Sequence, residues 1–210
     1  MRFLQPCRGT SMGNKCFRKF CRGIVRGIVK IFYRVEYIGE KYPEEGPYVI
    51  YPNHLSILDI VFVILHSKKR WVYFMAKSEL YKHKLSAWFL DKMGAFPVRR
   101  GQCDVRSIKR AVTLIQEGKL VCIFPQGTRQ KGNKILPPRR GVAMLSALTG
   151  AEVIPVFIER KAKIHKKTKV YVGKPVNTGL DRNSSKEEIA KKSVELMDIV
   201  YNLPEVYKDK

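Results

Sequence analysis

Long hydrophobic runs are missing from this sequence of 210 residues. No stretch approaches the roughly 18 to 20 uncharged apolar residues that a membrane-spanning helix needs. The N-terminal residues MRFLQPCRGTSMGNK carry positive charge but no apolar segment typical of a secretory signal. Because 45% of the residues are hydrophobic, the composition is that of an ordinary globular protein, and we expect one domain with a buried core.

Cysteine is also sparse, and its spacing excludes two kinds of site. The five cysteines, at positions 7, 16, 21, 103 and 122, form no CxxC pair and have no regular spacing. The sequence therefore predicts neither a disulfide framework nor a zinc site, and it favours reduced thiols in a cytosolic setting. Cys122 lies in the apolar run LVCIF and is expected in the core.

Acidic residues are few: 18 Asp and Glu stand against 41 Lys and Arg, which gives a net charge of +23. This imbalance predicts an anionic partner, and nucleic acid, anionic lipid and an acidic carrier protein all qualify. A non-enzymatic basic protein that binds by charge alone is one hypothesis. No helix-turn-helix or base-stacking motif is present, so a nucleic-acid partner is not expected.

The N-terminal region predicts a helix that contacts a membrane. Residues 1–15 are expected to be disordered, and residues 16–35 place Arg18, Arg22, Arg26, Lys30 and Arg34 at every fourth position, with apolar residues between them. This pattern predicts a basic amphipathic helix that binds the surface of an anionic membrane from the cytoplasmic side. The alternative is that the apolar side docks on the protein's own core and the arginines form a solvated face.

The remaining chain, residues 36–210, alternates between strand-like and helical segments. Short apolar runs at 48–52, 71–76, 120–125 and 153–158 predict buried strands, and residues 104–118, 139–150 and 184–202 predict helices. Asp104 is expected as an N-cap, and Ser184 with Glu187 as a capping box. The pattern predicts a single α/β domain whose mixed, largely parallel sheet is covered by helices.

The segment YPNHLSILD, residues 51–59, places a histidine and an aspartate directly after a predicted strand. In one interpretation Ser56 and Asp59 only cap the helix formed by the apolar run that follows. In the other, Asp59 reaches back to one nitrogen of His54 and leaves the other nitrogen free to take a proton.

Cationic side chains follow the other predicted strands. Arg129 lies in IFPQGTRQ (123–130), together with Gln126, Gly127 and Thr128, and a guanidinium there suits a phosphate or a carboxylate. Arg99 and Arg100 end GAFPVRR, and Lys77 follows the strand predicted at 71–76. Cations at separate strand ends can converge on one anion, because parallel strands end at the same edge of a sheet.

Taken in order, His54-x-x-x-x-Asp59, GAFPVRR, FPQGTR and VIPVFI resemble the four motif blocks of the glycerolipid acyltransferase family, which includes the 1-acylglycerol-3-phosphate acyltransferases. The blocks cover residues 48–160. The resemblance implies an enzyme of phospholipid biosynthesis at the cytoplasmic face of the cell membrane. It would transfer an acyl group from acyl carrier protein or coenzyme A to the sn-2 hydroxyl of 1-acylglycerol-3-phosphate and form phosphatidate.

The resemblance also implies a role for each matching residue. His54 corresponds to the general base and Asp59 to its partner. Arg100, Gly127 and Arg129 match positions that bind the phosphate of the acceptor, and Lys77 would join them. Arg99, Gln126 and Thr128 would support the site, and no metal or other cofactor is implied.

One position departs from the family pattern. The third block commonly reads Phe-Pro-Glu-Gly-Thr-Arg, and this chain has Gln126 in place of the glutamate. Glutamine removes a negative charge and makes the pocket more cationic. The acceptor therefore stays open, with glycerol-3-phosphate or another lysolipid as alternatives.

Lysines 161, 163, 167 and 169 of KAKIHKKTKV, residues 161–170, predict a basic strand. This face is expected to be solvated, or alternatively to receive an acidic acyl carrier protein or lipid head groups.

Overall fold

The computed structural model describes residues 12–99, 104–130 and 136–208. Its centre is a seven-stranded sheet with the order β1-β7-β6-β2-β5-β3-β4, in which every pairing is parallel except β6 with β7. The strands are β1 (Arg34–Gly39), β2 (Tyr48–Pro52), β3 (Val72–Lys77), β4 (Ala95–Val98), β5 (Leu120–Cys122), β6 (Glu152–Ile158) and β7 (Lys167–Val172).

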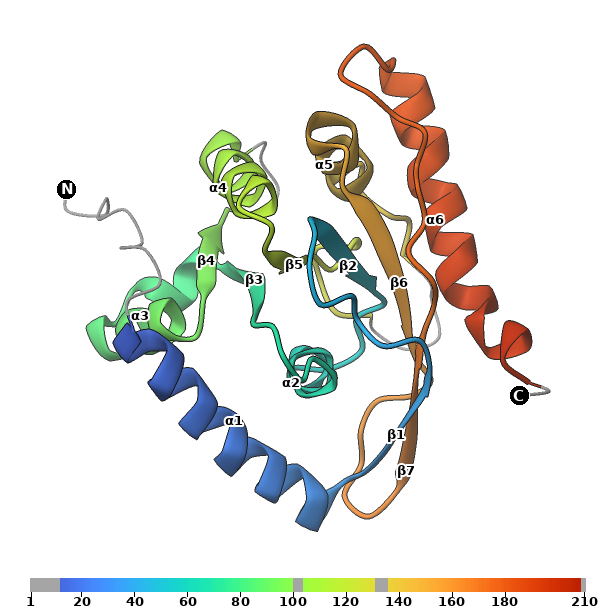
Figure 1. Cartoon of the computed structure of the whole chain (residues 1–210). Helices are drawn as coiled ribbons and strands as arrows, with labels where there is room; N and C mark the ends of the chain where they lie inside the picture. The colour runs from blue at the N-terminus through green and yellow to red at the C-terminus, as the bar shows by residue number, and fades with distance from the viewer. Residues whose placement is uncertain (1–11, 100–103, 131–135, 209–210) are drawn as a thin grey trace.

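Six α-helices and one short 3₁₀ helix accompany these strands in the described residues: α1 (Met12–Phe32), α2 (Leu58–His66), η1 (Ser78–Tyr81), α3 (Lys84–Lys92), α4 (Val105–Gln116), α5 (Gly141–Thr149) and α6 (Lys186–Val206). Helices lie on both sides of the sheet (Figure 1). The predicted fold class, an α/β domain with a mixed, mostly parallel sheet, is confirmed.

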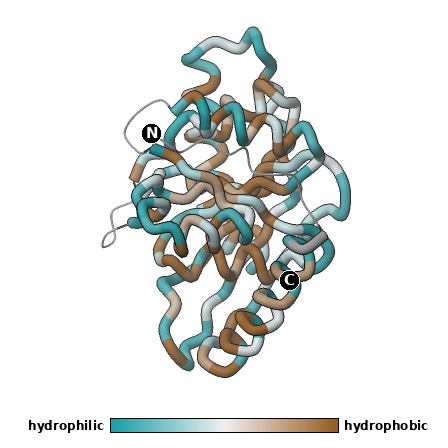
Figure 2. The backbone as a smooth tube through the Cα atoms, turned by 90° about the vertical axis from the view of Figure 1, so that its left-hand side faces the viewer, coloured by the Kyte–Doolittle hydropathy of each residue, from teal (hydrophilic) through white to brown (hydrophobic). Residues whose placement is uncertain are grey.

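The sheet separates two hydrophobic clusters. Residues Tyr51, Val121 and Val153 face one side and pack against α4, α5 and α6, and residues Ile50, Cys122 and Ile154 face the other side with α2 and part of α1. Strands that are buried on both faces need apolar side chains at consecutive positions, which explains the continuous runs in the sequence. Figure 2 shows the hydrophobic residues gathered along these central strands.

The parallel strands fix where the loops leave the sheet. β2, β5, β3 and β4 are neighbours and run in one direction, so their carboxyl ends meet at one edge. His54, the segment 126–129, Lys77 and Arg99 follow these four ends in that spatial order. The candidate residues predicted from separate segments therefore lie along a single edge of the sheet.

Helix α1 docks on the domain through its arginines. Arg18 is 5% exposed, donates from Nε to the Lys92 carbonyl at 2.7 Å, and places its guanidinium 5.4 Å from the Trp71 ring and 5.0 Å from the Tyr73 ring. Arg22 donates to the carbonyls of Ser67 and Lys68. Part of the predicted basic stripe therefore binds the protein itself, which neither sequence-based interpretation of the helix foresaw.

One exposed stripe of α1 is apolar. Phe20, Ile24, Ile28 and Ile31 are 47–67% exposed, whereas Val25 and Val29 pack on the core beside α2. Phe17 contacts Trp88 and Phe89 of α3 edge to face, with ring centroids 5.6 and 6.3 Å apart. The two helices thus present one apolar surface, which we define as Phe20, Ile24, Ile28, Ile31, Leu85 and Trp88. Within the described residues, no helix combines the length and hydrophobicity needed to cross a bilayer.

Several predicted boundaries shift in the structure. α1 begins at Met12 and ends at Phe32, whereas the prediction placed disorder over residues 1–15 and the helix at 16–35; residues 1–11 lie outside the described part. The predicted Ser184–Glu187 capping box is wrong by one residue, because Ser185 and Glu188 form it. Asp104 does cap α4, accepting from Ser107 N at 3.3 Å.

The predicted basic strand at 161–170 is also corrected. β7 begins only at Lys167, so Lys167 and Lys169 share a strand while Lys161 and Lys163 lie in the connection from β6. Lys167 is moreover paired with Glu36 of β1 at 2.9 Å. The four lysines therefore do not lie together on one face of a strand.

Candidate active site

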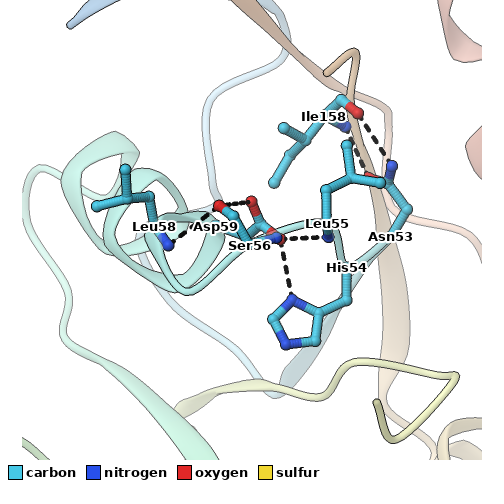
Figure 3. Close-up of polar contacts among 7 residues, drawn as sticks. All are labelled: Asn53, His54, Leu55, Ser56, Leu58, Asp59 and Ile158. Carbon is cyan, nitrogen blue, oxygen red and sulfur yellow. Dashed lines mark hydrogen bonds and ion pairs between the residues drawn. The ribbon is translucent and has the colours of Figure 1, made fainter. Parts of the chain in front are cut away.

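The Asp59 carboxylate is fully buried at the amino end of α2 and accepts four hydrogen bonds. Its Oδ2 accepts from the backbone N–H of Leu55 at 2.6 Å, from that of Ser56 at 2.7 Å and from His54 Nδ1 at 2.9 Å. Its Oδ1 accepts from the Ser56 hydroxyl at 2.9 Å. Figure 3 shows these donors converging on the carboxylate. The predicted contact of Asp59 with His54 is therefore present. The predicted capping box is only half formed: Asp59 accepts from the Ser56 N–H, but the N-cap of α2 is Ile57, which makes no side-chain cap hydrogen bond.

His54 is oriented by this carboxylate. An ionised carboxylate only accepts hydrogen bonds, so Nδ1 carries the hydrogen and Nε2 is the ring nitrogen with a free lone pair. Nε2 has no hydrogen-bond partner in the described part of the chain, and Figure 3 shows it pointing away from Asp59. The side chain is 12% exposed. This arrangement suits a proton acceptor that is held in one tautomer.

Two further contacts, which the sequence did not predict, hold the histidine segment. Phe124 stacks on the His54 ring, with centroids 4.0 Å apart and planes 27° from parallel. Asn53 is buried and bonds to both backbone groups of Ile158 in β6, at 2.7 Å from N and 2.9 Å to O. Asn53 therefore fixes the backbone before the histidine, and Phe124 restricts rotation of the ring.

The loop after β5 touches the histidine segment directly. The Gln130 backbone N–H donates to the His54 carbonyl at 2.8 Å, so residues 126–130 pass beside His54. Gly127 adopts φ +67, a left-handed conformation that other residues rarely adopt. The Arg139 Nε would lie 3.2 Å from a Cβ at Gly127, so this arginine covers the loop closely.

The polar residues of this loop point in different directions. Thr128 and Arg129 are exposed, and Arg129 makes no ion pair with another described residue. Gln126 is 3% exposed and lies near the Tyr201 hydroxyl of α6, but neither atom of its amide has a hydrogen-bond partner among the described residues. The Tyr201 hydroxyl accepts a hydrogen bond from Gln130 Nε2. The Gln126 amide is therefore buried against α6, while the Arg129 guanidinium remains at the surface.

Of the other predicted cations, the structure describes Lys77 and Arg99 but not Arg100. Lys77 lies at the carboxyl end of β3 and forms an exposed ion pair with Glu79 at 2.9 Å. Arg99 is exposed after β4, and its backbone N–H donates to Asp104 at 2.9 Å. Arg100 lies outside the described residues. The structure thus brings His54, Asp59 and the 126–130 loop into contact, and it places Lys77 and Arg99 farther along the same edge.

A thiol nucleophile is disfavoured at this site. Cys122 lies under the site in β5, and burial first and the Asp59 charge second raise the pKa of its thiol. The thiol therefore stays protonated. Among the residues that the structure describes, no three His, Cys, Asp or Glu side chains are grouped to hold a metal ion.

Comparison of the sequence with known proteins identifies the protein family to which the chain belongs. A sequence profile described as Acyltransferase matches residues 34–159, which is more than half of the chain and includes both the histidine segment and the 126–130 loop. The chain belongs to the Acyltransferase family, as the motif order predicted.

Its relatives carry more specific names. The chain is 30% identical over 165 residues to the 1-acyl-sn-glycerol-3-phosphate acyltransferase of Bacillus subtilis, covering 76% of this chain and 82% of that protein. It is 29% identical over 182 residues to the chloroplastic LPAT1 of Arabidopsis thaliana, covering 80% of this chain but only half of that longer protein. The crystal structure of PlsC from Thermotoga maritima shares the fold, with a TM-score of 0.71 at 24% identity over 96% of this chain and 85% of that one.

Replacing the Asp59 carboxylate should destabilise the protein measurably. In Asp59→Asn an NH₂ group replaces either Oδ2, which accepts from three N–H groups, or Oδ1, which accepts from the Ser56 hydroxyl, so at least one buried donor loses its acceptor. We expect the free energy of unfolding to fall by about 1–3 kcal/mol in urea titrations. The control is Asp198→Asn on the exposed side of α6. Equal midpoints for the two variants would contradict the hydrogen-bond network described here.

Proposed function

We propose that this chain transfers a fatty acyl group from an acyl thioester to the sn-2 hydroxyl of 1-acylglycerol-3-phosphate, forming phosphatidate in phospholipid biosynthesis. The observation that carries the proposal is the His54–Asp59 pair at 2.9 Å, with Nε2 unpartnered beside a loop that carries an arginine. The named activity of the Bacillus subtilis relative, of which the chain covers 82%, supports this choice of acceptor.

In the proposed reaction His54 is the general base. Nε2 takes the proton of the sn-2 hydroxyl as its oxygen attacks the thioester carbonyl, and Asp59 stabilises the imidazolium that forms. The tetrahedral intermediate then expels the thiolate, which takes the proton back from His54 as a thiol. The substrate hydroxyl is itself the nucleophile, so an acyl-enzyme is not needed.

The acceptor phosphate would bind to the cations along the carboxyl edge of the sheet. Arg129 offers a planar fork that matches phosphate oxygens, and Gly127 lets the loop backbone approach them. Lys77 and Arg100 would complete the clamp, supported by Arg99, Gln126 and Thr128. Holding the acceptor in this way brings the hydroxyl to Nε2, an effect worth up to roughly 7–11 kcal/mol in the most favourable intramolecular reactions. No metal or other cofactor takes part in this scheme.

The acyl donor is proposed to be the thioester of acyl carrier protein or of coenzyme A. Two acceptors compete with lysophosphatidate in the proposal, glycerol-3-phosphate and other lysolipids, because the uncharged Gln126 changes the balance of charge near Arg129. Initial rates with both donors and with each acceptor, measured on one preparation, distinguish these substrates.

The apolar surface of α1 and α3 is proposed to bind the cytoplasmic face of the cell membrane. Its six side chains are 47–77% exposed and include a tryptophan, and apolar and aromatic side chains of this kind enter the interfacial region of a bilayer. Lys30 is exposed beside the stripe and can reach anionic head groups. The acceptor and the product, both amphiphiles, would then be exchanged at the membrane surface.

Loss of the imidazole should abolish most of the activity. We expect His54→Ala to lower kcat/KM for phosphatidate formation by about 10²–10⁴-fold, the usual contribution of a general base, with an unchanged far-UV circular dichroism spectrum. Asp59→Asn should lower kcat/KM by at least about 10²-fold. His83→Ala, a change of an exposed histidine at the start of α3, is the control. Full activity of His54→Ala would refute the proposed base.

Removal of the apolar surface should release the protein from membranes without unfolding it. Ile24→Ser/Ile28→Ser changes two exposed side chains of α1 and leaves Arg18, Arg22 and Val29 to dock the helix. We expect co-sedimentation with phosphatidylglycerol vesicles to weaken at least tenfold, because each buried apolar side chain contributes about 1.5–3 kcal/mol. Val194→Ser/Ile199→Ser on α6 also changes two exposed apolar residues and should sediment like the wild type. If both pairs behave alike, α1 does not face the bilayer.

A further inference from the structure

A second cationic site lies at the opposite edge of the sheet. A half-open cavity of about 330 Å³ lies between α1 and the amino ends of β3 and β5, where Trp71 and Lys119 precede these strands. His54 follows the carboxyl end of the parallel strand β2. Because the two edges are separated by the length of the strands, at roughly 3.3 Å per residue, the cavity is distinct from the candidate active site.

The cavity is lined by seven cationic side chains and by no carboxylate. Arg18, which packs on Trp71 and Tyr73, is accompanied by Lys15, Lys19, Arg22, Lys69, Arg70 and Lys119. Among the described residues of the cavity, Lys69 forms an ion pair with Glu44 at 2.5 Å. Burial lowers the pKa of Arg70, and the charges of Tyr48 and Glu45 only partly oppose this. Lys15, Lys19 and Lys119 have no ion pair with any residue that the structure describes. The positive charge of the cavity is therefore largely uncompensated.

The arginines of the cavity are held rigidly by neutral groups. Arg70 donates to the carbonyls of Pro43 and Gly46 at 3.0 and 2.7 Å and also to that of Gly118, and Arg22 donates to Ser67 and Lys68. Carbonyl oxygens orient a guanidinium without cancelling its charge. The site is thus organised before any anion arrives.

Arg22 retains one donor that no described residue uses. Its Nε is covered from solvent and has no acceptor among the described residues. Burial first and the neighbouring Arg26 second lower the pKa of Arg22, whose guanidinium lies 4.9 Å from the Trp71 ring. An anion in the cavity would supply the countercharge that this guanidinium lacks.

We propose that this cavity binds the phosphate group of an anionic ligand between α1 and the sheet, with Lys19 and Arg22 of α1 and Lys119 before β5 as its principal contacts. A phosphate carries two negative charges near neutral pH and several acceptor oxygens, and ammonium and guanidinium groups together match it in charge and in hydrogen bonding. The volume lies at the small end of the roughly 300–1,000 Å³ typical of small-molecule pockets.

The direction of the cavity favours a soluble phosphate compound over a lipid head group. At about 100° per residue, Arg22 and Ile24 point roughly 160° apart on α1. The apolar surface defined above is proposed to meet the bilayer. The cavity therefore opens on the side of α1 that faces away from the bilayer. A head group of that bilayer would have to reach around the helix.

The test uses Trp71 as the reporter. The sequence has two tryptophans, so the exchange Trp88→Phe leaves Trp71, which lines the cavity, as the only one. Inorganic pyrophosphate is titrated at constant ionic strength while Trp71 emission is recorded. We expect a saturable change, with an affinity at least tenfold weaker in Lys19→Glu/Lys119→Glu. The matched control, Lys186→Glu/Lys191→Glu on α6, changes the net charge equally and should keep the affinity of its parent.

Vesicle sedimentation then separates the two sources of phosphate. If the cavity variant and the α6 control bind phosphatidylglycerol vesicles equally while their pyrophosphate affinities differ, the ligand is a soluble phosphate compound. If the cavity variant alone also loses vesicle binding, the phosphate belongs to a lipid head group. The absence of a saturable Trp71 response, or equal pyrophosphate affinities of the two double variants, would overturn the proposal. Neither readout involves turnover, so the result stands apart from the proposed acyl transfer.

Discussion

The buried carboxylate of Asp59 is the constraint on which the site depends. A charge removed from water is tolerated only when donors replace its hydration, and here two backbone N–H groups, a serine hydroxyl and the His54 ring supply them. All four donors come from residues 54–56, so they also determine the path of the chain from β2 into α2. The imidazole is consequently fixed by the same contacts that begin the helix.

The parallel sheet turns this local arrangement into a site. Because β2, β5, β3 and β4 end at one edge, segments separated by dozens of residues place their loops side by side, and the Gln130–His54 backbone contact joins two of them. Helix α1 covers the far side of α2 and exposes an apolar stripe, while its arginines bind the domain. The proposed membrane surface, the cationic cavity and the histidine site are therefore arranged around one rigid core.

Much of this organisation could be predicted from the sequence, because short-range patterns carry it. The apolar runs at 48–52 and 153–158 predict strands that the structure confirms almost to the residue, and Gly150 ends α5 in the left-handed conformation that glycine favours. The five-residue spacing of His54 and Asp59 allowed two interpretations, and the order of four motifs indicated the family that the comparisons confirm.

Other features could not be predicted, because they arise from packing between distant segments. Nothing in residues 16–35 indicates that the Arg18 guanidinium packs over the Trp71 ring. Either the basic or the apolar stripe of an amphipathic helix can dock on the protein. The stacking of Phe124 on His54 and the anchoring of Asn53 by Ile158 join residues 70 and 105 positions apart.

The central claim is that Asp59 holds His54 with the hydrogen on Nδ1 and with Nε2 free. It is tested most directly by the ¹⁵N chemical shifts of the His54 ring in labelled protein above the pH at which the ring loses its second proton. The account predicts a protonated Nδ1 and an unprotonated Nε2, with this preference lost in Asp59→Asn; a ring that carries its hydrogen on Nε2 would contradict it.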